Sequence, residues 1–466
     1  MTCNMPTKKR TKIVCTIGPA SSSPAKLKQL VQAGMNVARL NLSHGTHANH
    51  KQLIRNIRSV ARELKHPVAI IGDLQGPKIR VGELPDKGIK LQRGKTVEVP
   101  VTYEDLYKDV KKGHSILLDD GLMEGEIMSG RKGYLKFKVV VGGTLTSHKG
   151  INFPETNLSV SAITEKDKLD AKFCVEQKLH FVALSFVTDP ADVKKMRRIL
   201  GSAAKADQPL PKIVAKIEKH EAVDRFDEIL KAVDGIMVAR GDLGIETAAE
   251  GVPILQKEFI DKCRASAKPV IVATQMLDSM IRNPRPTRAE VSDVANAVID
   301  HTDAVMLSGE TATGKYPVEA VKTMTRIIEE AEASRYDDVS LEESSQLAEM
   351  VKDSVSGAAS LMVQTLKAKM ILALTGSGDT ARMVSRFRPE IPIIAIASDE
   401  FVRHQLNLSW AVQPYSLKMD HNTEDLIKRS TRLLKRNKLA RIGDKLVVIA
   451  SHPAGKKVNM LEIREI

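Results

Sequence analysis

The sequence contains few cysteines and few aromatic residues, and it has no long apolar run. Its four cysteines, Cys3, Cys15, Cys174 and Cys263, show neither paired nor metal-ligand spacing, which argues against a disulfide framework and against a zinc site. No stretch approaches the roughly 18 consecutive apolar residues of a membrane span, and no apolar segment follows the basic N-terminal region. We therefore expect a cytoplasmic protein that has no membrane partner.

Acidic residues are also in deficit, because 57 Asp and Glu face 71 Lys and Arg, giving a formal net charge of +14. A nucleic-acid-binding surface needs such charge gathered on one face, with aromatic side chains between the basic ones. Here the basic pairs are spread from Lys8 to Lys457, and aromatic residues make up only 3%. The excess is better suited to anionic metabolites and to solubility, and we expect no nucleic-acid partner.

What the sequence does contain is a long alternation of apolar strand patterns with amphipathic helix patterns. The expected strands are 11–18, 37–42, 68–74, 181–186, 212–217, 235–240, 269–275 and 304–310. The expected helices are 23–34, 47–64, 165–178, 190–200, 220–233, 253–266, 287–300 and 317–333. Eight strands and eight helices predict a (β/α)₈ TIM barrel, with function at the C-terminal ends of the strands.

Two segments depart from this alternation. Between about 75 and 157, glycine is frequent and short strands alternate with period two, as in KTVEVPV and YLKFKVVVGG. This pattern predicts a small all-β domain inserted as a lid. After an acidic linker, a helix over 351–369 and the strands MILALTG, IPIIAIAS and KLVVIAS predict a separate, mostly parallel α/β domain. The expected boundaries are 1–73 with 159–336 for the barrel, 74–158 for the lid and 337–466 for the C-terminal domain.

Two neighbouring strands of the expected barrel end in charged residues. The stretch KIVAKIE ends with Lys216 and Glu218, and GIMVARGD ends with Arg240 and Asp242. Because parallel strands of one βαβ unit lie side by side, the two carboxylates should meet at one edge of the sheet. Carboxylates beside cations suit Mg²⁺ together with a phosphorylated anion. Surface ion pairs are the alternative, but both clusters end strands apolar enough to be buried. The other strand ends carry Thr16, Arg39, Asn41, Asp73, Ser185, Thr274, Ser308 and Glu310.

The same stretches carry a resemblance to a known family. IVAKIEKHEAV at 213–223 and GIMVARGDLG at 235–244 resemble the signature of the pyruvate kinases. Further matches in order are ARLNLSHG at 38–45, GPKIR at 76–80, ATQMLDSM at 273–280, PTRAEVSDVANAV at 286–298 and MLSGETA at 306–312. The resemblance covers the whole chain. It implies transfer of the phosphoryl group of phosphoenolpyruvate to ADP, giving ATP and pyruvate, with Mg²⁺ as cofactor and Mn²⁺ as a possible substitute.

The resemblance also implies roles for single residues. Glu218 and Asp242 would bind Mg²⁺, and Lys216 would stabilise charge on the transferring group and on the enolate. Gly241, Asp242 and Thr274 would contact the substrate, and Arg39 would face its phosphate. Thr274 and Ser308 are candidates for positioning the water or proton path. For Ser308, and for Glu310, a purely structural role at the strand end is an equal alternative.

Nucleotide and monovalent-cation sites follow from the same resemblance. Asn41, His44, Arg80 and Lys149 would contact ADP, although a lone lid lysine is usually solvated. The family's monovalent-cation position matches Asn41, Ser43, Asp73 and Leu74. Leu74 offers no side-chain oxygen there, and Lys78 stands where potassium-dependent members carry glutamate. We expect the Lys78 ammonium to lie near Asp73 and to replace K⁺, so that K⁺ is not required; a surface lysine is the alternative.

In the C-terminal domain, the sequence after MILALTG predicts an anion site at a helix N-terminus. By resemblance this is an effector pocket for a sugar monophosphate, a bisphosphate or AMP; plain helix capping is the alternative. Its residues are Thr375, Ser377, Gly378, Asp379 and Thr380, joined by Lys456 and Lys457 of the loop SHPAGKK. The family usually forms homotetramers, and the final strand MLEIREI could pack across a two-fold axis or serve as an internal edge.

Two other functions compete with this interpretation. A barrel aldolase or lyase acting on pyruvate enolates needs the metal carboxylates, but neither the lid nor the lysine of KIVAKIE. An inactivated barrel that binds RNA or an acidic partner predicts the loss of catalytic residues, whereas Lys216, Glu218, Asp242 and Thr274 are all present. Both alternatives are therefore weaker than phosphoryl transfer.

Overall fold

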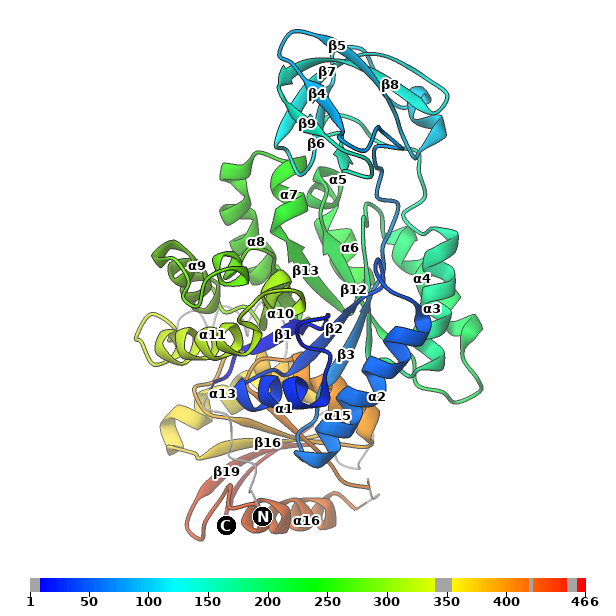
Figure 1. The fold of residues 1–466 in the computed structure, drawn as a ribbon. Helices are drawn as coiled ribbons and strands as arrows, with labels where there is room; N and C mark the ends of the chain where they lie inside the picture. Colours follow the sequence, from blue (N-terminus) through cyan, green and yellow to red (C-terminus); the bar gives the residue numbers. More distant parts are fainter. Residues whose placement is uncertain (1–8, 340–353, 419–421, 451–458) are drawn as a thin grey trace.

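A computed structural model describes residues 9–339, 354–418, 422–450 and 459–466. The chain forms a central barrel, an all-β domain above its mouth and an α/β domain below it (Figure 1). Within the described residues, no helix is both long enough and apolar enough to cross a membrane.

The barrel is a closed sheet of eight parallel strands, as the sequence predicts. Its strands are rich in Val, Ile and Ala and are buried along most of their length, which is typical of a parallel sheet covered on both faces. β1 pairs with both β2 and β15, and this closes the ring. The strands are β1 (Lys12–Thr16), β2 (Val37–Asn41), β3 (Ala69–Asp73), β11 (Phe181–Leu184), β12 (Lys212–Ile217), β13 (Gly235–Ala239), β14 (Val270–Ala273) and β15 (Ala304–Leu307).

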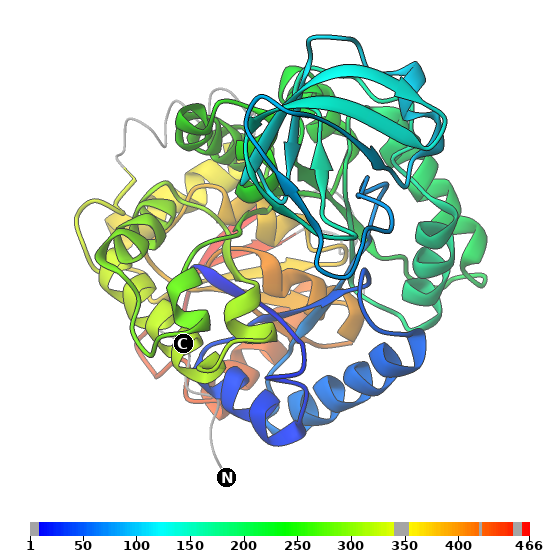
Figure 2. The same ribbon diagram turned by 45° about the horizontal axis from the view of Figure 1, so that its top comes forward.

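Helices surround the barrel (Figure 2), and several begin at a side-chain cap. Thr46, Thr164, Asp189 and Thr287 each accept a hydrogen bond from a backbone N–H of the first turn and form capping boxes. The helices are α1 (Pro24–Ala33), α2 (His47–Glu63), α3 (Glu165–Glu176), α4 (Pro190–Ala203), α5 (His220–Asp224), α6 (Phe226–Ala232), α7 (Arg240–Glu246), α8 (Val252–Ala265), α9 (Arg288–Ile299), α10 (Gly309–Ala312) and α11 (Pro317–Glu332).

The single helix expected over 220–233 is wrong, because it is broken into α5 and α6. Arg225 lies between them with φ −108° and ψ 21°, outside the helical range. Its guanidinium pairs with Asp189, before α4, and with Glu228, 2.6 Å away. The apolar spacing continues through the break, since Ala222 and Phe226 are both buried, and periodicity alone therefore gave no signal of it.

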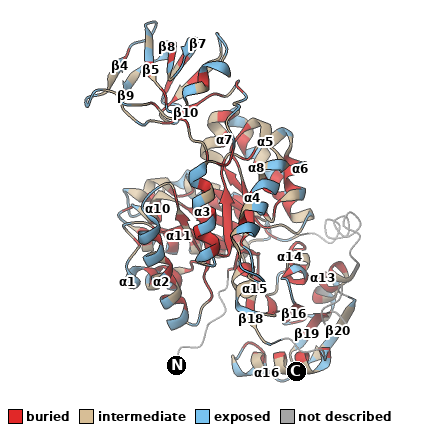
Figure 3. Ribbon diagram, turned by 90° about the vertical axis from the view of Figure 1, so that its right-hand side faces the viewer, coloured by how far each residue is buried: buried red, intermediate tan, exposed pale blue. Residues whose placement is uncertain are grey.

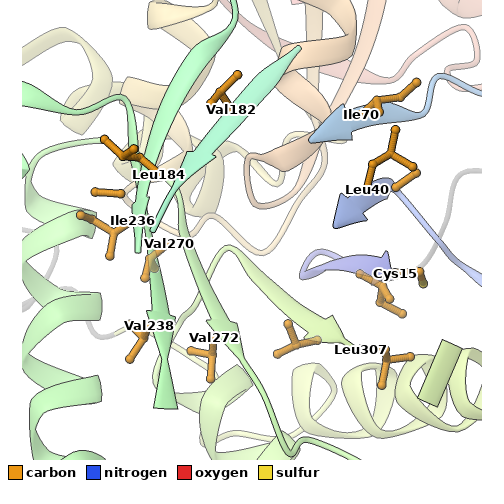
Figure 4. Close-up of a cluster of buried hydrophobic side chains, with 14 of the residues drawn as sticks. Cys15, Leu40, Ile70, Val182, Leu184, Ile236, Val238, Val270, Val272 and Leu307 are labelled. Carbon is orange, nitrogen blue, oxygen red and sulfur yellow. The ribbon is translucent and has the colours of Figure 1, made fainter. Parts of the chain in front are cut away.

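Alternation along each strand divides the barrel's apolar side chains into two layers. Inward-facing residues such as Val14 and Ile71 fill the interior. Outward-facing residues such as Cys15, Leu40 and Val238 pack against the helices (Figure 4). The exposed faces of the helices lie on the outside (Figure 3). Three cysteines, Cys15, Cys174 and Cys263, are buried free thiols, as expected for packing residues; Cys3 lies outside the described residues.

The inserted domain is all-β, as predicted. Its strands are β4 (Ile89–Leu91), β5 (Thr96–Pro100), β6 (Ser115–Leu118), β7 (Met123–Arg131), β8 (Tyr134–Val141), β9 (Gly143–Leu145) and β10 (Ile151–Asn152). The strands named from the sequence, KTVEVPV and YLKFKVVVGG, correspond to β5 and β8, and glycines interrupt the strand pattern of β7. Gly125 is required there because a Cβ at this position would clash with the ring of Phe137.

The C-terminal domain has a five-stranded sheet in which only β20 is antiparallel. Separate apolar clusters cover its two faces. The prediction omitted β18, where Pro414 weakens the strand pattern; β18 lies at the sheet edge, where proline is tolerated. The elements are α13 (Ser354–Leu366), β16 (Met370–Thr375), α14 (Asp379–Ser385), β17 (Ile393–Ala397), α15 (Glu400–Gln405), β18 (Val412–Ser416), α16 (Thr423–Arg436), β19 (Lys445–Ala450) and β20 (Met460–Glu465).

A loop of the C-terminal domain closes the bottom of the barrel. Leu408 is fully buried and belongs to the same apolar cluster as the inward-facing strand residues. Beside it, Asn407 donates a hydrogen bond to the carbonyl oxygen of Pro67, ahead of β3. The backbone N–H of Trp410 donates to Asp303, ahead of β15, over 3.0 Å. The barrel interior is therefore completed by a residue from another domain.

We expect Leu408→Ala to lower the free energy of unfolding by about 2–5 kcal/mol, because it leaves a cavity in a closed core. The chain has a single tryptophan, Trp410, which is fully buried two residues away. Urea unfolding followed by its fluorescence therefore reports on this interface. Ile442→Ala is the control, because Ile442 is 87% exposed in the same domain; equal stability of the two variants would contradict the plugging role.

Candidate active site

Four neighbouring strands bring charged side chains together at the barrel mouth. Lys216, on β12, places its Nζ atom 2.7 Å from Oε1 of Glu218 and 3.7 Å from Oδ1 of Asp73, at the end of β3. Its Nζ atom also donates to Oγ of Ser185, after β11, over 2.9 Å. On β2, Arg39 places its Nε atom 2.5 Å from Oδ2 of Asp73. The predicted mouth residues therefore form one connected network.

The network fixes the protonation of the lysine. Burial alone would lower the pKa of Lys216, but the charges of Asp73 and Glu218 outweigh burial, so this pKa lies above its ordinary value. Burial raises the pKa of Glu218, and the charge of Asp242 raises it further, while Lys216 and the N–H of Phe186 oppose the rise. Lys216 is thus a permanently charged ammonium held by two buried carboxylates.

Directly after β13, the chain turns into the short helix α7, which carries Gly241 and Asp242 in its first turn. The backbone N–H of Gly241 donates to Oγ1 of Thr274 over 2.8 Å, and this hydroxyl donates in turn to the carbonyl oxygen of Ala273 over 2.6 Å. The structure therefore brings together Gly241 and Thr274, two residues that the sequence assigned to substrate binding.

Thr274 has an unfavourable backbone conformation, with φ of 68° for a β-branched residue. Arg240 holds it in place, donating from Nη2 to the Thr274 carbonyl oxygen over 2.8 Å. The guanidinium is fixed in turn by both carboxylate oxygens of Asp293, at 2.7 and 2.8 Å. Backbone strain that is held in place by surrounding contacts is typical of a functional site.

Lys78 forms an ion pair with Asp242, and its expected place near Asp73 stays a prediction. Its Nζ atom is 3.8 Å from Oδ1 of Asp242, whereas the cationic partners of Asp73 are Arg39 and Lys216. β3 lies between β2 and β11 in the closed barrel, so Arg39 of β2 reaches Asp73 from one side, and Lys216 of β12, one strand beyond β11, reaches it from the other. Gly76 precedes Lys78 with φ of 67°, where a Cβ would come within 2.6 Å of the Phe186 ring, so this turn requires glycine.

The donor set fits a hard divalent cation. Among the described residues, no three His, Cys, Asp or Glu side chains are grouped as a complete metal site. Glu218 and Asp242 instead form a carboxylate pair at the ends of adjacent strands β12 and β13. Their negative charges disfavour each other, which is the electrostatic origin of part of the pKa rise at Glu218. Mg²⁺ is commonly held by one or two carboxylates, with water and substrate oxygens completing its shell.

Comparison with known proteins gives the same assignment over the whole length. The pyruvate kinase barrel domain matches residues 8–321, and the pyruvate kinase alpha/beta domain matches residues 353–464. The chain belongs to the pyruvate kinase family. The resemblance and the fold inferred from the sequence are therefore confirmed.

Several pyruvate kinases are similar to the chain over almost its full length. Pyruvate kinase 2 of Synechocystis sp. is 47% identical over 96% of this chain and 77% of its own length. Pyruvate kinase of Clostridium perfringens is 42% identical over 98% of this chain and 100% of its own length. A crystal structure of a pyruvate kinase from Cryptosporidium parvum superposes with a TM-score of 0.92 at 36% identity, covering 98% of this chain and 96% of that one.

Glu310 has a structural place in the mouth. It is only 2% exposed, and it accepts hydrogen bonds from the backbone N–H groups of Leu277, at 3.1 Å, and Ser308, at 2.7 Å. Burial raises the pKa of Glu310. These bonds tie the loops after β14 and β15 together, which favours the structural alternative for Glu310. For Ser308, the bond accounts for the backbone N–H alone, and the role of the hydroxyl stays a prediction.

The residues assigned to ADP have other partners in this structure. Arg80 donates from Nη1 to the carbonyl oxygen of His148 over 2.8 Å, and Nζ of Lys149 lies 2.8 Å from Oδ1 of Asp119. Both contacts lie within the inserted domain. Asn41 accepts from the Ser43 N–H over 3.1 Å, and His44 is exposed. Nucleotide contacts by Arg80 and Lys149 would therefore require these partners to be exchanged.

The proposed effector loop is also internally bonded. Oγ1 of Thr375 accepts from the Gly378 N–H over 2.9 Å, and the Ser377 hydroxyl donates to Asp379 over 2.5 Å. Arg382 pairs with Asp379 and so partly neutralises the helix start. Thr380 is buried. Lys456 and Lys457 lie outside the described residues.

Sequence reasoning missed two interactions that support the site. Asp293 lies inside the matched stretch PTRAEVSDVANAV, but nothing in that stretch indicated Arg240 as its partner. Asn152, on β10, donates to Oε1 of Glu246, at the end of α7, over 2.7 Å. The partners in each pair are far apart in the sequence, so only the barrel closure and the path of the inserted domain bring them together.

Proposed function

We infer that this chain is a pyruvate kinase, which transfers the phosphoryl group of phosphoenolpyruvate to ADP and forms ATP and pyruvate in glycolysis. The observation that carries this inference is the charged Lys216 between Asp73 and Glu218, at the mouth of a barrel whose family is shown along the whole chain. The comparisons give no support to an aldolase or lyase.

The side chains of the mouth suit this reaction in distinct ways. Phosphoryl transfer depends on positioning and on neutralising charge that is spread over the transferring oxygens. Lys216 offers a preorganised cation for these oxygens and then for the enolate. Arg39, fixed by Asp73, presents a second cation to the phosphate. The N–H groups at the start of α7 suit the substrate carboxylate.

Thr274 and the carboxylate pair complete the proposal. The hydroxyl of Thr274, held by the Gly241 N–H and the Ala273 carbonyl, can orient a proton donor toward the enolate carbon, with Ser308 as a second candidate. Glu218 and Asp242 would hold Mg²⁺, or Mn²⁺ in its place, and the bound ion supplies positive charge for phosphoryl and enolate oxygens. We further propose that lid closure brings Arg80 and Lys149, together with Asn41 and His44, to ADP and excludes water.

The direct test is pyruvate formation from phosphoenolpyruvate, coupled to NADH oxidation by lactate dehydrogenase, with and without ADP. We expect pyruvate and ATP in equal amounts, only when ADP and Mg²⁺ are both present. Pyruvate formation that needs no nucleotide would favour the lyase alternative. Salt-sensitive RNA binding without any transfer would favour the non-enzymatic one.

We propose that a phosphorylated effector binds the loop at the start of α14. The proposal is supported by the hydroxyls of Thr375, Ser377 and Thr380 around the N–H groups of Gly378 and Asp379, with Lys456 and Lys457 adding charge. Ser377→Glu with Thr380→Glu should abolish activation by sugar phosphates or AMP and leave the basal rate unchanged, since added carboxylates repel phosphate. Lys435→Glu, exposed in the same domain, is the control; retained activation in the double variant would contradict the proposal.

Assembly and location complete the proposal. We propose a homotetramer in the cytoplasm, with β20 as a candidate packing edge because it ends the sheet and leaves Ile463 48% exposed. We also propose the domain limits 1–73 with 159–336, 74–158 and 337–466. The gap between β3 and α3, which contains all strands of the inserted domain, supports the first two ranges.

A further inference from the structure

The inserted domain is joined to the barrel by two chain segments that pair with each other. The N–H of Val81 donates to the carbonyl oxygen of Lys149 over 2.9 Å, and the N–H of Ile151 donates to that of Ile79 over 3.0 Å. The two connections therefore form one antiparallel base at the domain junction.

Two side chains reach from this base to α7, one at each end of the helix. Lys78 places its Nζ atom 3.8 Å from Oδ1 of Asp242, in the first turn. Asn152 donates from Nδ2 to Oε1 of Glu246, the last residue of the helix, over 2.7 Å. β10, which carries Asn152, lies just above α7 in Figure 3. The helix is thus held at both ends by the connections of the inserted domain.

The contact at Glu246 is buried. Asn152 is 6% exposed and Glu246 is 4% exposed. Both line a cavity of about 60 Å³ at the domain junction, together with Lys219 and Glu221. Burial raises the pKa of Glu246, while Lys219 and the Asn152 hydrogen bond oppose the rise. A hydrogen bond in such surroundings is strong, and its loss leaves a buried carboxylate oxygen without its donor.

The length of α7 makes it a short rigid connection. It runs from Arg240 to Glu246, and at about 1.5 Å per residue its last residue lies roughly 6 Å along the axis from Asp242. A shift at Glu246 therefore displaces Gly241 and Asp242 by a similar distance. Small displacements of positioning groups are costly for a transfer that depends on alignment.

We propose that Asn152 and Glu246 are positioning residues, which couple the placement of the inserted domain to the substrate and metal contacts of α7. The inference rests on the proposed roles of Gly241 and Asp242. The inserted domain would then have a second function besides covering ADP. Its hydrogen bond from Asn152 to Glu246 would set the position of the helix that holds phosphoenolpyruvate and the divalent ion.

Exchange of the two hydrogen-bonding partners provides the test. Asn152→Ala removes the donor and should raise the KM for phosphoenolpyruvate and the apparent Kd for Mg²⁺ roughly tenfold, the scale of losing a hydrogen bond to a buried charged group. The KM for ADP should change by less than about threefold. Asn152→Asp places two buried carboxylates together and should have a larger effect at pH 8, relieved toward pH 6 as the pair takes up a proton.

Glu246→Gln supplies the rescue. Combined with Asn152→Asp, it restores the hydrogen bond, with the donor now on helix α7 and the acceptor on β10. The KM for phosphoenolpyruvate and the apparent Kd for Mg²⁺ should then return to within about threefold of the parent values. If the hydrogen bond only stabilises the fold, the variants should change the melting temperature and kcat and leave the KM for phosphoenolpyruvate and the Kd for Mg²⁺ unchanged. That result, or a double variant with restored melting temperature but unrestored constants, overturns the proposal.

Two further measurements separate this inference from the proposed function. Ser159→Ala is the matched control, because the Ser159 hydroxyl, just after the inserted domain, donates to Asp109 of that domain over 2.7 Å; the variant should leave the phosphoenolpyruvate and Mg²⁺ constants unchanged. Calorimetric titration of the full chain with Mg²⁺ and phosphoenolpyruvate, without ADP, measures the coupling without turnover. If the parent chain makes no ATP, the proposed function fails, whereas altered binding in Asn152→Ala still supports the coupling and unaltered binding refutes it.

Discussion

Lys216→Met is expected to lower kcat by at least two orders of magnitude, on the order of a thousandfold, the scale measured for the loss of a preorganised charge-stabilising group. Its ammonium is held 2.7 Å from Glu218 and 3.7 Å from Asp73, in a mouth where it is only 13% exposed. Water cannot reorganise there as it does in bulk. The charge that develops on the transferring oxygens and the enolate is therefore stabilised chiefly by this fixed cation.

The expected pH behaviour follows from the direction of the pKa shift. The pKa of Lys216 is raised, so its contribution to stability is complete below the ordinary lysine pKa and is lost only as pH rises through the folded-state pKa. Activity between about pH 6 and 9 should therefore show no step from this lysine. Such a step in the parent chain would contradict the assignment of a permanent cation.

A suitable control uses another lysine of the same strand. Lys212 begins β12, at the opposite end from the mouth, and Lys212→Met should retain full kcat. Removing Lys216 also leaves the buried carboxylate of Glu218 without its cation, while Asp73 keeps Arg39; the loss of such a buried partner costs about 3–5 kcal/mol of stability. Circular dichroism must therefore show that Lys216→Met is folded under the assay conditions. A folded variant that keeps more than a tenth of the parent kcat would contradict the proposed role.

The barrel and its mouth could be predicted because both depend on local pattern. Apolar β-branched runs ending in polar residues specify buried parallel strands, and parallel strands place their C-terminal ends at one face. This rule places Arg39, Asp73, Lys216 and Glu218 at a single mouth from the sequence alone. It required no knowledge of which side chain pairs with which.

Pairings could not be predicted, because they depend on geometry that spans the sequence. Lys78 is one example: Arg39 and Lys216 are the ion-pair partners of Asp73, whereas Lys78 pairs with Asp242. Two further features, an edge strand and a helix break, were not predicted because the local sequence pattern indicated otherwise. Pro414 concealed an edge strand, and continuous apolar spacing concealed the helix break at Arg225.

The second large effect concerns the monovalent cation. We expect turnover of the parent chain in a tetramethylammonium buffer, free of K⁺ and NH₄⁺, to remain within about twofold of that with K⁺. Leu74 is only 1% exposed and has no side-chain oxygen, and the Lys78 ammonium lies 3.8 Å from Asp242. At this separation, opposite charges attract by about 1–4 kcal/mol between the limits of water and an effective dielectric of about 20. The lysine thus supplies positive charge on the chain itself, beside the metal carboxylate.

Lys78→Glu with Leu74→Thr should reverse this property. The new carboxylate repels Asp242, and the threonine adds an oxygen beside Asp73, so the site gains the charge and the ligands for a bound cation. We expect kcat without K⁺ to fall at least tenfold, the effect of about 1.4 kcal/mol, and to recover when K⁺ is added. Lys90→Glu makes the same charge change at an exposed position of the inserted domain and should show neither effect. The proposal fails if the parent chain itself loses nearly all turnover without K⁺ and regains it with K⁺, because Lys78 would then not replace the ion.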